Sequence, residues 1–126
     1  MCEVHLSARC HPTEDRERVA GALKAFFPDA IVEGDDVLYA QSRSVEAFAE
    51  QLAKQRIRAA ARKMLLRNVV GDEVHFRLSK QVATTGKISL SEEDHALGDI
   101  EVTIRSADIE AVVDRIAPRP RQGDAA

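Results

Sequence analysis

The sequence predicts an α+β fold, a single domain with a mainly antiparallel sheet and helices packed on one face. Its 126 residues are enough for one self-sufficient core. Several segments alternate apolar and polar residues between short turns, which is typical of antiparallel strands, and others carry apolar residues at helical spacing. The expected order is β-α-β-β-α-α-β-β-β-α, with the domain over residues 1–118 and a flexible tail over 119–126.

The first elements follow from alternation and from turn residues. Residues 2–10 alternate strictly, which predicts a half-buried strand. A helix is expected between Thr13, a good N-cap, and Pro28, which ends it. Residues 31–33 and 37–41 flank a Gly-Asp-Asp turn and predict a hairpin.

Two apolar stripes predict a broken helix in the middle of the chain. The stripes are Val45, Phe48, Ala49 and Leu52, followed by Ile57, Ala60, Ala61 and Met64. At about 100° per residue, the second stripe is rotated by roughly 140° from the first, so one straight helix cannot direct both at one core. We therefore expect a break near Gln55-Arg56 and a second helix over about Arg56–Asn68.

The last third of the chain predicts three strands and one helix. Residues 74–78 and 100–104 alternate clearly, whereas residues 87–90 carry a weaker strand pattern. The final helix has Ile109, Val112, Val113 and Ile116 on one face and stops before Pro118.

The net charge of −3 conceals a strong separation of charge along the chain. Residues 51–91 contain nine basic and two acidic residues, a net charge of +7. The remaining residues contain nine basic and nineteen acidic residues, a net charge of −10. A mildly acidic protein thus has a strongly basic central third.

The basic residues of the second middle helix lie on the arc opposite its apolar stripe. Such a face is compatible with a solvated surface, with nucleic-acid binding or with an acidic protein partner. Few aromatic residues occur in 51–91, which favours recognition of RNA shape and phosphate over base stacking. The candidate RNA-binding residues are Lys54, Arg56, Arg58, Arg62, Lys63, Arg67, Arg77, Lys80 and Gln81.

Four motifs in order along the chain resemble those of one family. They are Pro12-Thr13-Glu14-Asp15, the run Gln55–Arg62, Ser79-Lys80-Gln81-Val82-Ala83, and Leu97-Gly98-Asp99-Ile100. The resemblance covers about residues 2–118 and is to an archaeal family of small uncharacterised proteins classed as predicted RNA-binding proteins. The third motif departs from the family pattern Asn-Lys-Gln-Ala-Ala at Ser79 and Val82 but retains Lys80 and Gln81.

The resemblance implies a fold like that of the fifth protein of the large ribosomal subunit. It also implies archaeal origin and a role in binding RNA, and it carries over no catalytic or metal-binding residue. A polar role for Lys80 and Gln81 is implied as well, whereas a contact that needs the family's asparagine is not.

Other classes of site receive no support from the residue pattern. Cys2, His5, Cys10 and His11 cluster in sequence, but a strand would direct Cys2 and His5 to opposite faces, so we expect no metal site. No nucleophile elbow or phosphate-binding glycine loop is present, so we expect neither catalysis nor a cofactor. The sequence has no signal-peptide pattern and no apolar run of membrane-spanning length, so we expect a cytoplasmic protein.

The leading hypothesis is a non-catalytic RNA-binding protein that contacts the phosphate backbone through the basic helix face. The alternative is a protein–protein interaction module in which that face docks an acidic surface, either of another protein or of a second copy in a homodimer. The acidic remainder of the chain makes such self-association electrostatically reasonable.

Overall fold

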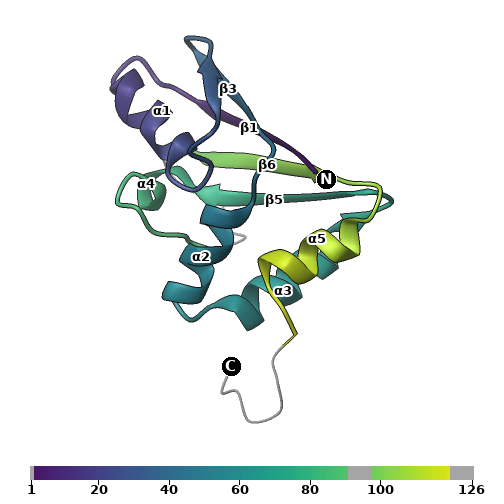
Figure 1. The fold of residues 1–126 in the computed structure, drawn as a ribbon. Helices are drawn as coiled ribbons and strands as arrows, with labels where there is room; N and C mark the ends of the chain where they lie inside the picture. Colours follow the sequence, from purple (N-terminus) through teal and green to yellow (C-terminus); the bar gives the residue numbers. More distant parts are fainter. Residues whose placement is uncertain (1, 91–97, 120–126) are drawn as a thin grey trace.

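The computed structural model describes residues 2–90 and 98–119, and Figure 1 shows their arrangement. A six-stranded sheet has the order β2-β3-β1-β6-β5-β4, and every neighbouring pair is antiparallel. The strands are β1 (Glu3–Arg9), β2 (Ile31–Glu33), β3 (Val37–Ser42), β4 (Val69–Val70), β5 (Glu73–Ser79) and β6 (Asp99–Arg105). The helices are α1 (Arg16–Lys24), α2 (Glu46–Lys54), α3 (Arg58–Arg67), α4 (Lys80–Ala83) and α5 (Ile109–Ile116).

The sheet is buried on one face only. In β1 and β6 the buried residues alternate with more exposed ones, and the strand register aligns buried partners such as Leu6 and Val102. The helices pack on the side of these buried residues, and the opposite face stays accessible (Figure 1). The expected α+β class with helices on one face is therefore confirmed.

Phe48 of α2 lies at the centre of the core. Its ring stacks on Phe27 and on Phe76, with ring centroids 5.7 and 5.6 Å apart, and meets the edge of Phe26 at 6.3 Å. These partners come from the segment after α1 and from β5, so one aromatic side chain joins both to α2. All of the chain's phenylalanines thus form a single cluster in an otherwise aliphatic core.

The helix predicted between Thr13 and Pro28 is shorter than expected at both ends. Asp15, not Thr13, is the N-cap, because its side chain accepts a hydrogen bond from the Glu17 amide at 2.9 Å. The helix ends at Lys24, and a tighter turn follows in which the Phe27 amide donates to the Lys24 carbonyl. The turn lets the adjacent Phe26 and Phe27 both reach the core.

The predicted break between the middle helices is confirmed. Arg56 has a φ of 58°, a conformation that interrupts the helix, and α3 begins at Arg58. The apolar stripes of α2 and α3 then both face the core through Phe48, Leu52, Ala61 and Met64.

The observed element order differs from the expected one between residues 68 and 90. The predicted strand at residues 87–90 is wrong, because the backbone of Ile88 bonds to the side chain of Gln55 and to no strand. Two short elements, β4 and α4, were not expected. Strand β4 is only two residues long, and α4 begins where the Ser79 hydroxyl accepts from the Val82 amide.

Phe48→Ala should destabilise the protein by about 3–5 kcal/mol, because it removes a fully buried ring from three aromatic contacts. Chemical denaturation measures the change. Leu66→Ala on α3 is the control, since this leucine is exposed and its truncation should cost less than about 0.5 kcal/mol. Equal destabilisation by the two substitutions would contradict a core centred on Phe48.

Candidate nucleic-acid interface

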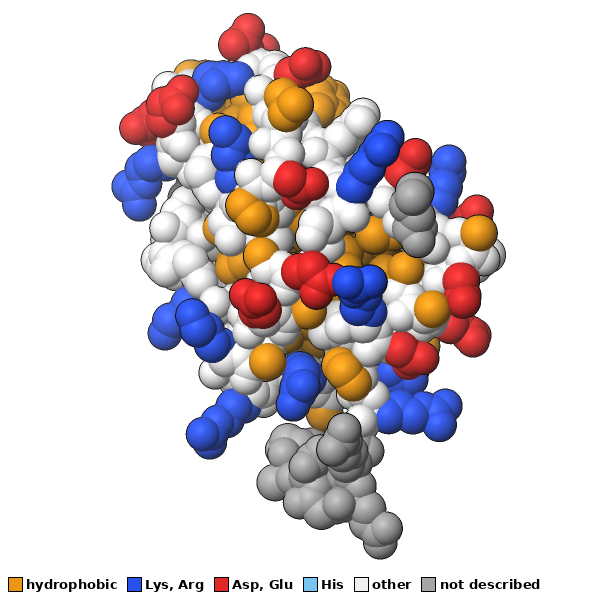
Figure 2. Space-filling view, in the orientation of Figure 1, with side chains coloured by type: hydrophobic (Ala, Val, Ile, Leu, Met, Phe, Trp, Pro, Cys, Tyr) orange, Lys and Arg blue, Asp and Glu red, His pale blue; other side chains and the backbone are white. Residues whose placement is uncertain are grey.

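Five of the predicted RNA-binding side chains are exposed between the end of α2 and the end of α3. Helix α3 buries Ala61, Met64 and Leu65 against the core, and its basic residues other than Arg62 are exposed. In Figure 2, Lys and Arg side chains line the lower end of the molecule, the end at which Figure 1 places α3. We call the set of exposed residues the basic corner: Lys54, Arg56, Arg58, Lys63 and Arg67.

Gln55 holds the basic corner against a distant segment of the chain. Its side-chain amide donates to the Ile88 carbonyl at 2.9 Å, and its side-chain oxygen accepts from the Ile88 amide at 2.7 Å. This pair of bonds places the exposed Lys87 close to the corner. The charge count of residues 51–91 includes Lys87, but nothing in its sequence position indicates this contact.

Arg62 lies apart from the basic corner because it is bound within the fold. Its Nη1 atom lies 2.6 Å from Asp114 Oδ1 and 3.0 Å from the Ala117 carbonyl oxygen, and its side chain is only 12% exposed. Arg62 therefore joins α3 to α5, and its positive charge is largely neutralised. Arg62 therefore does not belong to the basic corner.

Lys80 is also a residue of the interior. It is 1% exposed, and its Nζ atom donates to the Arg9 carbonyl at 2.6 Å and to Glu14 Oε1 at 2.7 Å. The prediction that Lys80 contacts RNA is wrong, because a side chain held in this way cannot reach a phosphate. Its neighbour Gln81 is exposed, but lies on α4 rather than at the basic corner.

The Lys80–Glu14 pair explains why two of the sequence motifs occur together. Glu14 Oε1 also accepts from the His11 amide at 3.1 Å. Burial raises the pKa of the Glu14 carboxyl, but the hydrogen bonds from Lys80 and His11 and their positive charge outweigh it, so the net pKa is lowered. The pair joins the end of β1 and the start of α1 to the junction of β5 and α4.

Arg77 lies on the accessible face of the sheet, whereas the basic corner belongs to the helix layer that covers the other face. Its Nη1 atom is 3.6 Å from Asp99 Oδ2 on the neighbouring strand. A groove of about 360 Å³ nevertheless links the two layers along β5, and both Arg67 and Arg77 line it. Met64, Phe76 and Leu90 also line the groove, together with Asn68 and His75.

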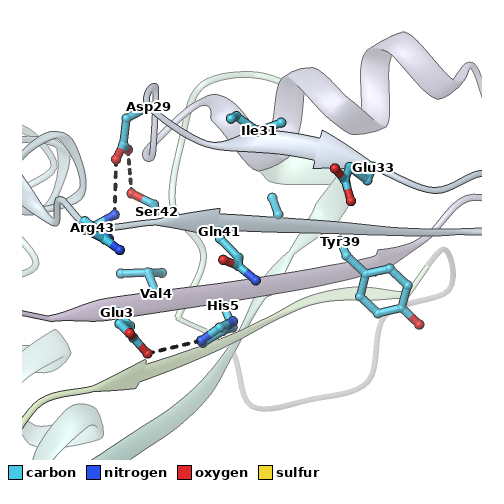
Figure 3. A pocket seen from close by; sticks show the side chains of 11 residues that line it. Glu3, Val4, His5, Asp29, Ile31, Glu33, Tyr39, Gln41, Ser42 and Arg43 are labelled. Atoms are coloured by element: carbon cyan, nitrogen blue, oxygen red, sulfur yellow. Dashed lines mark hydrogen bonds and ion pairs between the residues drawn. The ribbon is translucent and has the colours of Figure 1, made fainter.

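The accessible face of the sheet carries polar and aromatic side chains that are not among the predicted RNA-binding residues. We call it the open face, and its central residues are His5, Tyr39, Gln41, His75, Glu101 and Thr103. Figure 3 shows its β2–β3–β1 side, where a depression of about 510 Å³ is lined by His5, Tyr39 and Gln41 among others. The polar positions of each alternating strand are the sequence signal that identifies these residues.

The cysteine and histidine cluster near the N-terminus does not converge. Cys2 is buried on the helix side of the sheet, whereas His5 is exposed on the open face. Over residues 2–90 and 98–119, no three His, Cys, Asp or Glu side chains are grouped as a metal ion would require. In the same ranges, no helix is long and apolar enough to cross a membrane.

Glu14→Gln should destabilise the protein by about 3 kcal/mol, because it leaves the buried Lys80 ammonium without its counter-charge. Lys80→Met should cost less, because Glu14 keeps its bond from the His11 amide and is 16% exposed. Urea unfolding measures both. A larger loss for Lys80→Met would contradict this account of the pair.

The stabilisation by Glu14 should depend on pH in one direction. Since its pKa is lowered in the folded state, its contribution is complete above the ordinary value of 4.5 and is lost as pH falls through the folded pKa. The stability difference between the natural protein and Glu14→Gln should therefore be constant near neutrality and shrink in acid. A difference that grows on acidification would contradict the lowered pKa.

Comparison with known proteins identifies the relatives of this chain. Residues 3–106 match a family model described as RNA binding. A UPF0201 protein of Sulfolobus acidocaldarius is 38% identical, and the match covers 98% of this chain and 92% of that protein. A UPF0200/UPF0201 protein of Archaeoglobus fulgidus is 36% identical, but the match covers only 39% of that longer protein.

Solved structures agree with the sequence relatives. A crystal structure of an uncharacterised UPF0201 protein has a TM-score of 0.85 at 36% identity, over 93% of this chain and 94% of that one. A UPF0201 protein from Methanococcus jannaschii has a TM-score of 0.84 at 29% identity, over 98% of both chains. The chain therefore belongs to the archaeal UPF0201 family, whose family model carries the description RNA binding.

Proposed function

We propose that this protein binds RNA without catalysis and that the basic corner makes the phosphate contacts. The observation that carries the proposal is the exposure of five cationic side chains between the end of α2 and the end of α3. The RNA-binding family model supports the choice of RNA as the ligand. Phosphate contacts of this kind depend on charge and supply most of the affinity in non-specific binding.

The position of the acidic residues supports the same surface. Helix α5 places Asp114 against Arg62, and its Arg115 pairs with Glu46 of α2, so these charges are neutralised within the fold. Between Glu50 and Asp72 the sequence contains no acidic residue, whereas all five members of the basic corner lie in that stretch. A polyanion that approaches the α2–α3 turn thus meets a local positive potential, although the net charge of the protein is negative.

The guanidinium groups of the basic corner suit phosphate chemistry. Three of its five members are arginines, whose planar groups present paired N–H donors to phosphate oxygens. Since α3 is anchored through Arg62 and the corner through Gln55, these side chains extend from a rigid base. Because this base is already ordered, binding does not incur the loss of conformational entropy that ordering a flexible loop would cost.

Binding should weaken steeply with salt if about five phosphates are contacted. The plot of log K against log salt should then have a slope of roughly −4, so affinity falls by about two orders of magnitude from about 50 to 200 mM. Fluorescence anisotropy with a labelled RNA hairpin that has a single-stranded tail measures the slope. A flat dependence would overturn the proposal.

The double substitution Arg58→Ala and Lys63→Ala should reduce the magnitude of the slope by roughly 1.5 and weaken binding at low salt. The matched control replaces two exposed cations of α1, Arg18 and Lys24, with alanine and leaves the basic corner intact. Equal effects of the two double variants would indicate only a loss of overall positive charge. Sedimentation at low salt checks whether the basic corner instead mediates self-association.

A further inference from the structure

We propose that the open face of the sheet binds unpaired bases of the same RNA, with Tyr39 as the stacking platform, His5 beside it and His75 farther along the same depression. The inference rests on the proposed function, because it assigns a second part of the RNA to a second surface. It differs from the sequence-based expectation of recognition by shape and phosphate alone.

The exposure of Tyr39 is typical of a residue that binds a ligand, and not of a residue that stabilises the core. It is the chain's one tyrosine, it lies in the middle of β3, and 59% of its surface is exposed. Every phenylalanine, in contrast, is buried. An aromatic ring on an accessible sheet surface offers an unpaired base a flat apolar partner, and such stacking is tolerant of base identity.

The strand register places the His5 imidazole next to this ring, and it places His75 two strands beyond His5 on the same face. His5 lies opposite Gln41 on β3 and opposite Thr103 on β6, so it is a diagonal neighbour of Tyr39 across the β1–β3 pair. His75 lies opposite Thr103 on the other side, and its Nδ1 atom is 2.8 Å from the Thr103 hydroxyl. Diagonal neighbours such as His5 and Tyr39 lie about 7–8 Å apart, within reach of adjacent nucleotides. His75 lies three strands from Tyr39, roughly 14 Å across the sheet, so it would meet a different nucleotide of the same strand.

The charge of the open face favours bases over phosphates. Several of its carboxylates are paired: Glu3 with His5 at 3.8 Å, Asp99 with Arg77, and Glu73 with Arg105. Glu33 and Glu101 lie in the same cross-strand row as Tyr39, opposite Tyr39 and Ser7 respectively. Carboxylates repel phosphate groups but accept hydrogen bonds from the amino groups of bases, so a strand on this face would direct its bases inward.

The open face is continuous with the basic corner around the edge of β5. His75 lines the groove that also holds Arg67 and Arg77. It lines a second depression of about 390 Å³ together with His5, Tyr39 and Thr103. A single strand whose phosphates contact the basic corner can therefore pass over this groove and lay its next bases on the open face.

The test compares a single-stranded RNA with a fully paired duplex of the same length, using fluorescence anisotropy on the full chain. Tyr39→Ala should weaken binding of the single strand about tenfold and leave duplex binding unchanged. Tyr39→Phe keeps the ring and should retain single-strand affinity. Thermal unfolding confirms that the variants fold, as expected for an exposed position.

The other outcomes separate this inference from the proposed function. Unchanged single-strand binding by Tyr39→Ala, while Arg58→Ala and Lys63→Ala weaken binding to both RNAs, overturns the open-face assignment alone. Failure of the natural protein to bind either RNA overturns the proposed function. If Tyr39→Ala alters the sedimentation coefficient but not RNA affinity, the open face is an interface between copies of this chain and the inference is wrong.

Discussion

The burial of Phe48 is the contact on which the arrangement of the other elements depends. A sheet that is covered on one face needs helices whose apolar sides meet it at the same place. Phe48 satisfies this need by stacking on Phe27 and Phe76, which joins α2 to the segment after α1 and to β5. The turn at Arg56 changes the direction of α3. If α2 and α3 formed one continuous helix, the apolar stripe of α3 would point away from the core.

Two polar contacts complete what the aromatic cluster begins. Lys80 and Glu14 join the start of α1 to the end of β5, and Gln55 holds the backbone of Ile88 beside the α2–α3 turn. Buried polar groups persist only when they find such partners. Three of the four sequence motifs therefore contain residues that build the fold, and the proposed RNA contacts fall to their exposed neighbours.

The exposed chemistry is divided between two layers. Cations gather on the helix side, at the basic corner, whereas Tyr39 and the two imidazoles lie on the open face of the sheet. The edge of β5 connects the layers, because the two-residue β4 pairs with only Glu73 and Val74. A net charge of −3 describes neither surface, since it sums regions that face different directions.

The sequence by itself determined the α+β class, the broken helix and the separation of charge, because these depend on local periodicity and composition. Tertiary structure alone decided which charged residues remain available. Lys80 and Arg62 are as basic in sequence as Arg58, but their carboxylate partners lie 66 and 52 residues away. Tyr39 and His75 likewise come onto one face only through strand pairing. Contacts between distant residues leave no local period, so the site required the folded chain.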